Sequence, residues 1–160
     1  MKTVIVYYSW TGKTELVAKA IAKSLNADVR KVEEVKKRKG SFGFISGGWS
    51  ARKEQFSEIK PIDFNLGNYN LIFLVTPVWA RRPTPAINAF ISKADFRDKE
   101  VVLFATMSGV GAENTIKIMA NRIETKGGKV INSFAIKTGG LEDEKIIKQG
   151  EDIGRQYRDE

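Results

Sequence analysis

A short segment rich in hydroxyl side chains follows the first apolar run of this sequence. The segment is Ser9-Trp10-Thr11-Gly12-Lys13-Thr14, and a helical pattern begins directly after it at Glu15. Backbone N–H groups at a helix N-terminus attract an anion, hydroxyls add donors, and a glycine lets the backbone approach closely. A helix cap without a ligand would explain one hydroxyl residue, but not three together with a glycine. The segment therefore predicts a phosphate-binding loop.

Two better-known phosphate motifs do not fit this segment. A P-loop needs two glycines with four residues between them before its Lys-Thr pair, and a dinucleotide fingerprint needs three spaced glycines. The segment contains only Gly12. We therefore expect the anion to be held by hydroxyls and by the backbone amides of Trp10 to Lys13.

Two further segments follow apolar runs later in the chain. In Thr76-Pro77-Val78-Trp79-Ala80 a large aromatic residue stands among prolines, where it could stack on a planar ligand or simply seal the end of a sheet. In Thr106-Met107-Ser108-Gly109-Val110-Gly111 two glycines precede an acid-led helix start, so backbone amides could face the polar edge of the same ligand. Considered alone, the latter is an ordinary turn.

Alternating strands and helices must position these three segments. Short apolar or β-branched runs predict five strands, at Thr3–Tyr8, Ala27–Val32, Leu71–Thr76, Val101–Thr106 and Val130–Ile136. Apolar stripes at helical spacing predict helices around residues 16–25, 87–91, 116–123 and 142–158. Thr84-Pro85 is typical of a helix start, and Lys126-Gly127-Gly128 of a helix end.

This alternation predicts an α/β doubly wound parallel sheet with helices on both faces. The first, third and fourth runs are nearly continuous rather than alternating, as expected for strands covered on both sides. In such sheets ligands bind outside the carboxyl ends of the strands, where the three segments would lie. The exception is a long connection at residues 34–68, in which we expect a short helix near Phe44 to Gln55.

Composition limits the chemistry. A length of 160 residues predicts one domain over residues 1–160, and 42% hydrophobic with 29% charged residues is typical of a globular protein. The chain has no cysteine and no histidine, which excludes thiolate nucleophiles and the commonest metal ligands. We predict no metal site and no catalytic residue of its own, so any redox chemistry requires a bound cofactor. No apolar run approaches the roughly 20 residues that span a bilayer, and no signal peptide is visible, so we expect a cytoplasmic protein.

The three segments together resemble those of flavodoxins. Ser9-x-Thr11-Gly12-x-Thr14 is similar to their phosphate loop, Thr76-Pro77-Val78-Trp79 to the loop that lays an aromatic ring against the isoalloxazine, and Thr106 to Gly111 to the loop under its pyrimidine edge. The resemblance spans nearly the whole chain, in the right order. It implies FMN as cofactor and a five-stranded sheet of order 2-1-3-4-5.

The sequence departs from that family in two respects. Ordinary flavodoxins are acidic, whereas this chain has a net charge of +8. Their third loop usually ends in a second aromatic that covers the flavin, but no aromatic residue lies between Thr106 and Asn114. Trp10 is then the candidate for the second aromatic, either on the ring or over the phosphate and ribityl chain. The length of the chain is similar to that of small flavodoxin-like proteins, which have no insertion in the fifth strand.

The resemblance implies a redox protein, in one of two roles. The first is an electron carrier between protein partners, which the positive charge predicts to be acidic; the alternative is an NAD(P)H oxidoreductase acting on quinone-like or other small acceptors. A non-redox binding module is a further alternative, with the basic segment 30–60 binding an acidic partner or, less favoured, nucleic acid. A receiver domain is excluded because its acidic cluster and phosphoacceptor are replaced by Ser9-Trp10 and Thr76-Pro77.

The segment 34–56 is predicted to be a docking or homodimer surface. It places Phe42, Phe44, Ile45 and Trp49 beside the basic run Lys36 to Lys39. Residues 30–60 carry nine Lys/Arg against four Glu, so the basicity of the chain is concentrated here. A solvated face is the plain alternative.

Overall fold

The computed structural model describes residues 1–38, 49 and 56–158. Its centre is a five-stranded, all-parallel sheet of order β2-β1-β3-β4-β5. The predicted strand order and fold class are therefore confirmed. Apart from Trp49, the helix expected near Phe44 to Gln55 lies outside the described residues, as does most of the predicted docking surface 34–56.

Each predicted strand is present, with small differences at its ends. The strands are β1 (Thr3–Tyr7), β2 (Asp28–Lys31), β3 (Leu71–Pro77), β4 (Glu100–Met107) and β5 (Lys129–Lys137). β4 begins one residue before the apolar run because Glu100 pairs with Leu71 at the start of β3. The inner strands are the most apolar, as the continuous runs predicted, since both their faces are covered.

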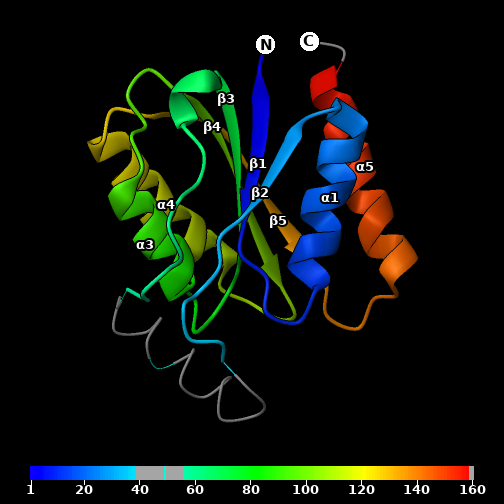
Figure 1. Ribbon diagram of the computed structural model, residues 1–160. Coiled ribbons are helices and arrows are strands. Elements are labelled where there is room, and N and C mark those ends of the chain that lie inside the picture. The colour runs from blue at the N-terminus through cyan, green and yellow to red at the C-terminus, as the bar shows by residue number, and fades with distance from the viewer. Residues whose placement is uncertain (39–48, 50–55, 159–160) are drawn as a thin grey trace.

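Helices cover both faces of the sheet (Figure 1). α1 (Lys13–Leu25) and α5 (Asp143–Arg158) pack side by side on one face, while α3 (Pro85–Lys93) and α4 (Ala112–Thr125) lie on the other. A 3₁₀ turn, η1 (Leu66–Asn68), leads into β3. None of the helices in the described ranges combines the length and apolarity that crossing a bilayer requires.

Two apolar clusters, one on each face, hold the layers together. Because side chains alternate along a strand, Ile72 and Leu74 of β3 belong to the cluster under α3 and α4, whereas Phe73 and Val75 belong to the cluster under α1 and α5. Phe73 stacks on Phe104 of β4 at 5.7 Å between ring centroids. The strands are thus anchored from both sides, which fixes where their carboxyl ends lie.

Helix ends follow the sequence signals. The Thr84 hydroxyl accepts a hydrogen bond from the Ile87 amide, and Pro85 occupies the first turn of α3. α4 ends at Thr125, followed by Gly127 with a positive φ of 83°. Both predicted boundaries are confirmed.

Candidate functional site

A cavity of about 360 Å³ lies at the carboxyl edge of the sheet. Its volume is within the range of small-molecule sites. Loops after β1, β3, β4 and β5 all contribute to it, so it forms only where four parallel strands end together. The lining residues are Trp10, Thr11, Lys13, Thr14, Pro77, Val78, Trp79, Thr106, Met107, Ser108, Thr138, Gly139, Gly140 and Leu141. We call this cavity the cleft.

The loop after β1 presents a helix N-terminus to the cleft. Gly12 occupies the N-cap position of α1 with φ of 96°, a conformation that a residue with a side chain rarely adopts. Within the described chain no side chain caps this helix, so its first-turn amides are available to an anion. The Ser9 hydroxyl accepts the Gly12 amide at 3.1 Å and shapes the turn instead of lining the cleft.

Hydroxyl groups from the start of α1 and the end of β4 meet at the cleft. The Thr14 and Thr106 side-chain oxygens are 2.8 Å apart and both residues are buried, which ties α1 to the end of β4. Thr11 is exposed and lines the cleft. Lys13 also lines it, and its Nζ lies 2.6 Å from Asp143 Oδ1 at the start of α5. The predicted phosphate loop thus places two hydroxyls and one ammonium group at the cleft.

Residues at the end of β3 and in the loop after it have two different roles: one supports the fold and the others line the cleft. Thr76 is fully buried; its hydroxyl donates to the Pro77 carbonyl at 3.0 Å and accepts the Thr84 amide at 3.3 Å, so it joins β3 to α3 and does not line the cleft. Pro77, Val78 and Trp79 do line it. The Val78 amide donates to the Thr106 carbonyl at 2.8 Å, which fixes this loop against β4.

A strained turn follows Trp79. Ala80 and Arg81 have φ of 50° and 62°, and Trp79 and Arg82 exchange two backbone hydrogen bonds of 3.0 Å. Two successive left-handed residues are typical of Asn-Gly turns, so Ala-Arg here is held by its surroundings. The Asn114 side-chain Nδ2 donates to the Arg81 carbonyl at 2.8 Å. Ala80 and Gly111 do not line the cleft; they belong to this supporting contact, because a Cβ on Gly111 would meet Arg81 at 2.7 Å.

The loops after β4 and β5 touch each other at the cleft. The Thr138 amide donates to the Met107 carbonyl at 2.8 Å, and an added Cβ on Gly139 would lie 2.4 Å from Ser108 Cβ. Met107 and Ser108 line the cleft, whereas Gly109 does not. Sequence reasoning missed Thr138 to Leu141, although the pair Gly139-Gly140 directly after the fifth apolar run was the available signal.

Among the described residues, Trp79 packs against three other side chains. Its ring lies 5.9 Å from the Trp10 ring and 5.7 Å from the Tyr8 ring, both edge to face, and the Arg38 guanidinium lies 5.6 Å from its centroid. Only 8% of Trp79 is exposed. The Trp10 indole N–H donates to the Arg38 carbonyl at 3.2 Å. Residues after β2 therefore support both tryptophans of the cleft, which sequence reasoning did not anticipate.

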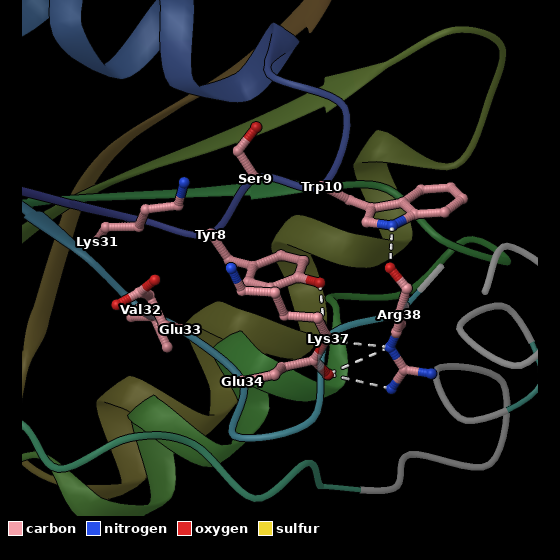
Figure 2. A pocket seen from close by; sticks show the side chains of 9 residues that line it. All are labelled: Tyr8, Ser9, Trp10, Lys31, Val32, Glu33, Glu34, Lys37 and Arg38. Carbon is pink, nitrogen blue, oxygen red and sulfur yellow. Dashed lines mark hydrogen bonds and ion pairs between the residues drawn. The ribbon is translucent and has the colours of Figure 1, made fainter. Parts of the chain in front are cut away.

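The buried carboxylate of Glu34 anchors this support, and Figure 2 shows Tyr8 and Arg38 converging on it. Glu34 accepts the Tyr8 hydroxyl at 2.8 Å and the Arg38 Nε at 3.2 Å from both carboxyl oxygens, and it also accepts the Ser57 hydroxyl. Burial, followed by the charge of Glu34, raises the pKa of Tyr8 well above its usual range. Tyr8, Glu34 and Arg38 line a second, smaller cavity of about 270 Å³ that shares Trp10 with the cleft.

Comparison with known proteins identifies relatives of this fold. Residues 2–142 match a family model described as Flavodoxin. No curated protein matches the chain. A candidate flavoprotein from Bacteroides uniformis is 22% identical, with 92% of this chain and 96% of that chain covered and a TM-score of 0.74.

Two other solved structures are similar as well. A flavoprotein from Lactobacillus acidophilus, crystallised in complex with FMN, is 25% identical over 92% of this chain and 97% of that one, with a TM-score of 0.70. A flavodoxin from the domain Archaea is 16% identical over 99% and 97%, with a TM-score of 0.64.

Proposed function

Since the chain belongs to the flavodoxin family, we propose that it binds FMN in the cleft and carries electrons between protein partners. The observation that carries this proposal is the cleft itself, which gathers the three loops of the family pattern at one edge of the sheet. The similar flavoprotein crystallised with FMN supports the choice of cofactor. We also propose that the 160 residues form one FMN-binding domain.

The loop after β1 fits the FMN phosphate. Gly12 has no atom within 4 Å of an added Cβ, so the turn leaves open space above the uncapped N-terminus of α1. The proposed donors are the amides of Trp10, Thr11 and Lys13 and the hydroxyls of Thr11 and Thr14, because the Gly12 amide already donates to the Ser9 hydroxyl. Lys13 adds positive charge, reduced by its exposed ion pair with Asp143.

The walls of the cleft fit a planar, partly apolar ring. Trp10 and Trp79 come from the loops after the neighbouring strands β1 and β3, and Pro77, Val78 and Met107 add apolar surface. Ser108 and the backbone after β4 supply polar groups for the pyrimidine edge. Bound FMN would supply the electron-accepting and electron-donating chemistry. The described residues would bind it, orient it and keep water from one of its faces.

Positive charge beside the cleft supports partner binding. Arg81 is exposed at the strained turn next to Trp79, and the whole chain has a net charge of +8. An acidic partner would be steered to this edge, most strongly at low salt. We propose that the segment 34–56 extends the docking surface or joins two copies, which mass measurements and the salt dependence of partner kinetics would test.

The same charge favours the second candidate, an NAD(P)H oxidoreductase. Cations near the ring stabilise the anionic, fully reduced cofactor, so they bring the two one-electron potentials together and make two-electron transfer accessible. Steady-state oxidation of NADPH with a quinone separates the roles. Turnover identifies a reductase, whereas electron exchange limited to proteins identifies a carrier.

The first experiment is the absorption spectrum of the purified protein and identification of the ligand that heat releases. FMN supports the proposal; a colourless protein that binds no added FMN contradicts it and leaves the non-redox binding module. Trp79→Ala then tests the ring site. We expect weaker FMN binding and a gain in flavin fluorescence, with Trp79→Phe as the control that keeps an aromatic ring. Unchanged affinity and fluorescence in Trp79→Ala would show that Trp79 is only structural.

A further inference from the structure

Three aromatic rings form a continuous path from the cleft into the interior. Trp10 and Trp79 line the cleft, with 5.9 Å between their ring centroids, and Tyr8 follows at 5.7 Å from Trp79. Edge-to-face rings at these separations are in direct contact. Electrons can pass between them without crossing solvent or saturated side chains.

The inner end of this path is paired with a base. The Tyr8 hydroxyl donates to Glu34 Oε2 at 2.8 Å, and both side chains are buried. A phenol that loses an electron becomes a very strong acid, so its proton passes to a hydrogen-bonded carboxylate. Arg38 Nε donates to both carboxyl oxygens of Glu34 and so holds the carboxylate in place beside Tyr8.

Arg38 also favours electron transfer from Tyr8 to an oxidised Trp79. Its guanidinium lies 5.6 Å from the Trp79 ring centroid, and a cation there opposes a second positive charge on the indole. Oxidised Tyr8 carries no positive charge, because its proton leaves together with the electron.

We propose that Trp10, Trp79 and Tyr8 form a relay that carries an electron vacancy from the cleft to Tyr8, with Glu34 as the proton acceptor. A one-electron oxidant in the cleft takes an electron from tryptophan and leaves an indole radical cation. Tyr8 then gives one electron to that indole while its O–H bond breaks and the proton moves to Glu34 Oε2. The products are neutral tryptophan, a neutral tyrosyl radical and a protonated Glu34.

The transfer changes the charge of two of the three groups that meet here. An indole cation and a carboxylate are both converted to neutral groups, which burial favours, while Arg38 then faces a neutral carboxyl group instead of a carboxylate. The relay thereby restores the tryptophans of the cleft. It rests on the proposed function only for its natural oxidant, which would be light-excited FMN.

A test that needs no flavin uses azide radicals, which oxidise tryptophan, followed by transient absorption. The chain has three tryptophans, so a Trp49→Phe background leaves only Trp10 and Trp79. We expect the tryptophan radical to decay as a tyrosyl radical appears. In Tyr8→Phe the tyrosyl signal is lost and the tryptophan radical persists, because phenylalanine keeps the ring but has no hydroxyl group that could lose a proton.

Tyr69→Phe is the matched control. The Tyr69 hydroxyl also donates to a carboxylate, Asp28 Oδ2, at 2.7 Å, but Tyr69 precedes β3 at the opposite edge of the sheet. This variant should behave like the parent. A tyrosyl signal that survives Tyr8→Phe, or that Tyr69→Phe abolishes equally, overturns the relay.

The proton acceptor has its own tests. In D2O the parent should transfer more slowly, because a proton moves with the electron; an unchanged rate overturns the role of Glu34. Glu34→Gln should stop the transfer, and if this variant does not fold, the isotope measurement still decides. Finally, a light flash applied to FMN-loaded protein should give the same tyrosyl signal. Failure to load FMN contradicts the proposed function alone, whereas loaded protein without that signal contradicts the relay.

Discussion

Gly139→Ala should open the cleft by separating two loops. The added Cβ would lie 2.4 Å from Ser108 Cβ and 2.5 Å from Ser108 Cα. Because carbon atoms pack at about 3.5–4.0 Å, the loops after β4 and β5 must move apart by about 1 Å. The neighbour is largely backbone, so no side-chain rotation relieves the contact.

The magnitude combines the steric clash with two weakened hydrogen bonds. Overpacking of this kind destabilises by about 1–3 kcal/mol. The separation also weakens the bonds from the Thr138 and Gly139 amides to the Met107 carbonyl, at 2.8 and 3.4 Å, which are worth about 0.5–1.5 kcal/mol each. A total of roughly 2–6 kcal/mol lowers the Tm of a chain this size by about 4–24 °C.

Urea and thermal unfolding measure the stability, and titration with FMN measures the site. Gly109→Ala is the matched control, because an added Cβ there meets nothing within 4 Å. We expect the control to stay within about 0.5 kcal/mol of the parent. Equal stability of Gly139→Ala and the control, or unimpaired FMN binding by Gly139→Ala, would refute the reasoning.

Three other predictions concern single groups. Thr11→Val should weaken FMN binding about tenfold or more, since a hydrogen bond to a charged group is worth about 1.5–3 kcal/mol, and unchanged affinity by titration would contradict the phosphate site. Ala80→Gly should raise the free energy of unfolding by up to about 1 kcal/mol, because φ at Ala80 is 50°, whereas Ala135→Gly in extended β5 should lower it; equal effects in urea unfolding would show that the turn is unstrained. Burial raises the pKa of Tyr8, so its contribution to stability is present below about pH 10 and lost as the pH rises above that value. Tyr8→Phe should therefore lose less stability than the parent between about pH 8 and about pH 11, and parallel losses would contradict the assignment.

Much of the cleft could be predicted from residue types alone. Trp10, Thr11 and Thr14 belong to a short segment whose hydroxyls and glycine are suited to binding an anion. All three line the cleft in the folded chain. The strands were equally visible, since continuous apolar runs are stable only where both faces of a strand are covered. Trp79 follows from the same logic, because the position of a residue after a parallel strand places it at the ligand-binding edge.

Other features depend on contacts between distant segments. Thr76 occupies a predicted site loop, yet its hydroxyl bonds to Thr84 because strand and helix meet there. Gly139 reaches the cleft because β5 pairs with β4 in one register and brings its loop against Ser108. Glu34 is one of many charged residues after β2, and only tertiary packing buries it beneath Tyr8 and Arg38. Residue type and spacing thus determined which loops could bind a phosphate and a ring, whereas pairing across the sheet decided which side chains support them, because burial and register are properties of the packed chain and of no single segment.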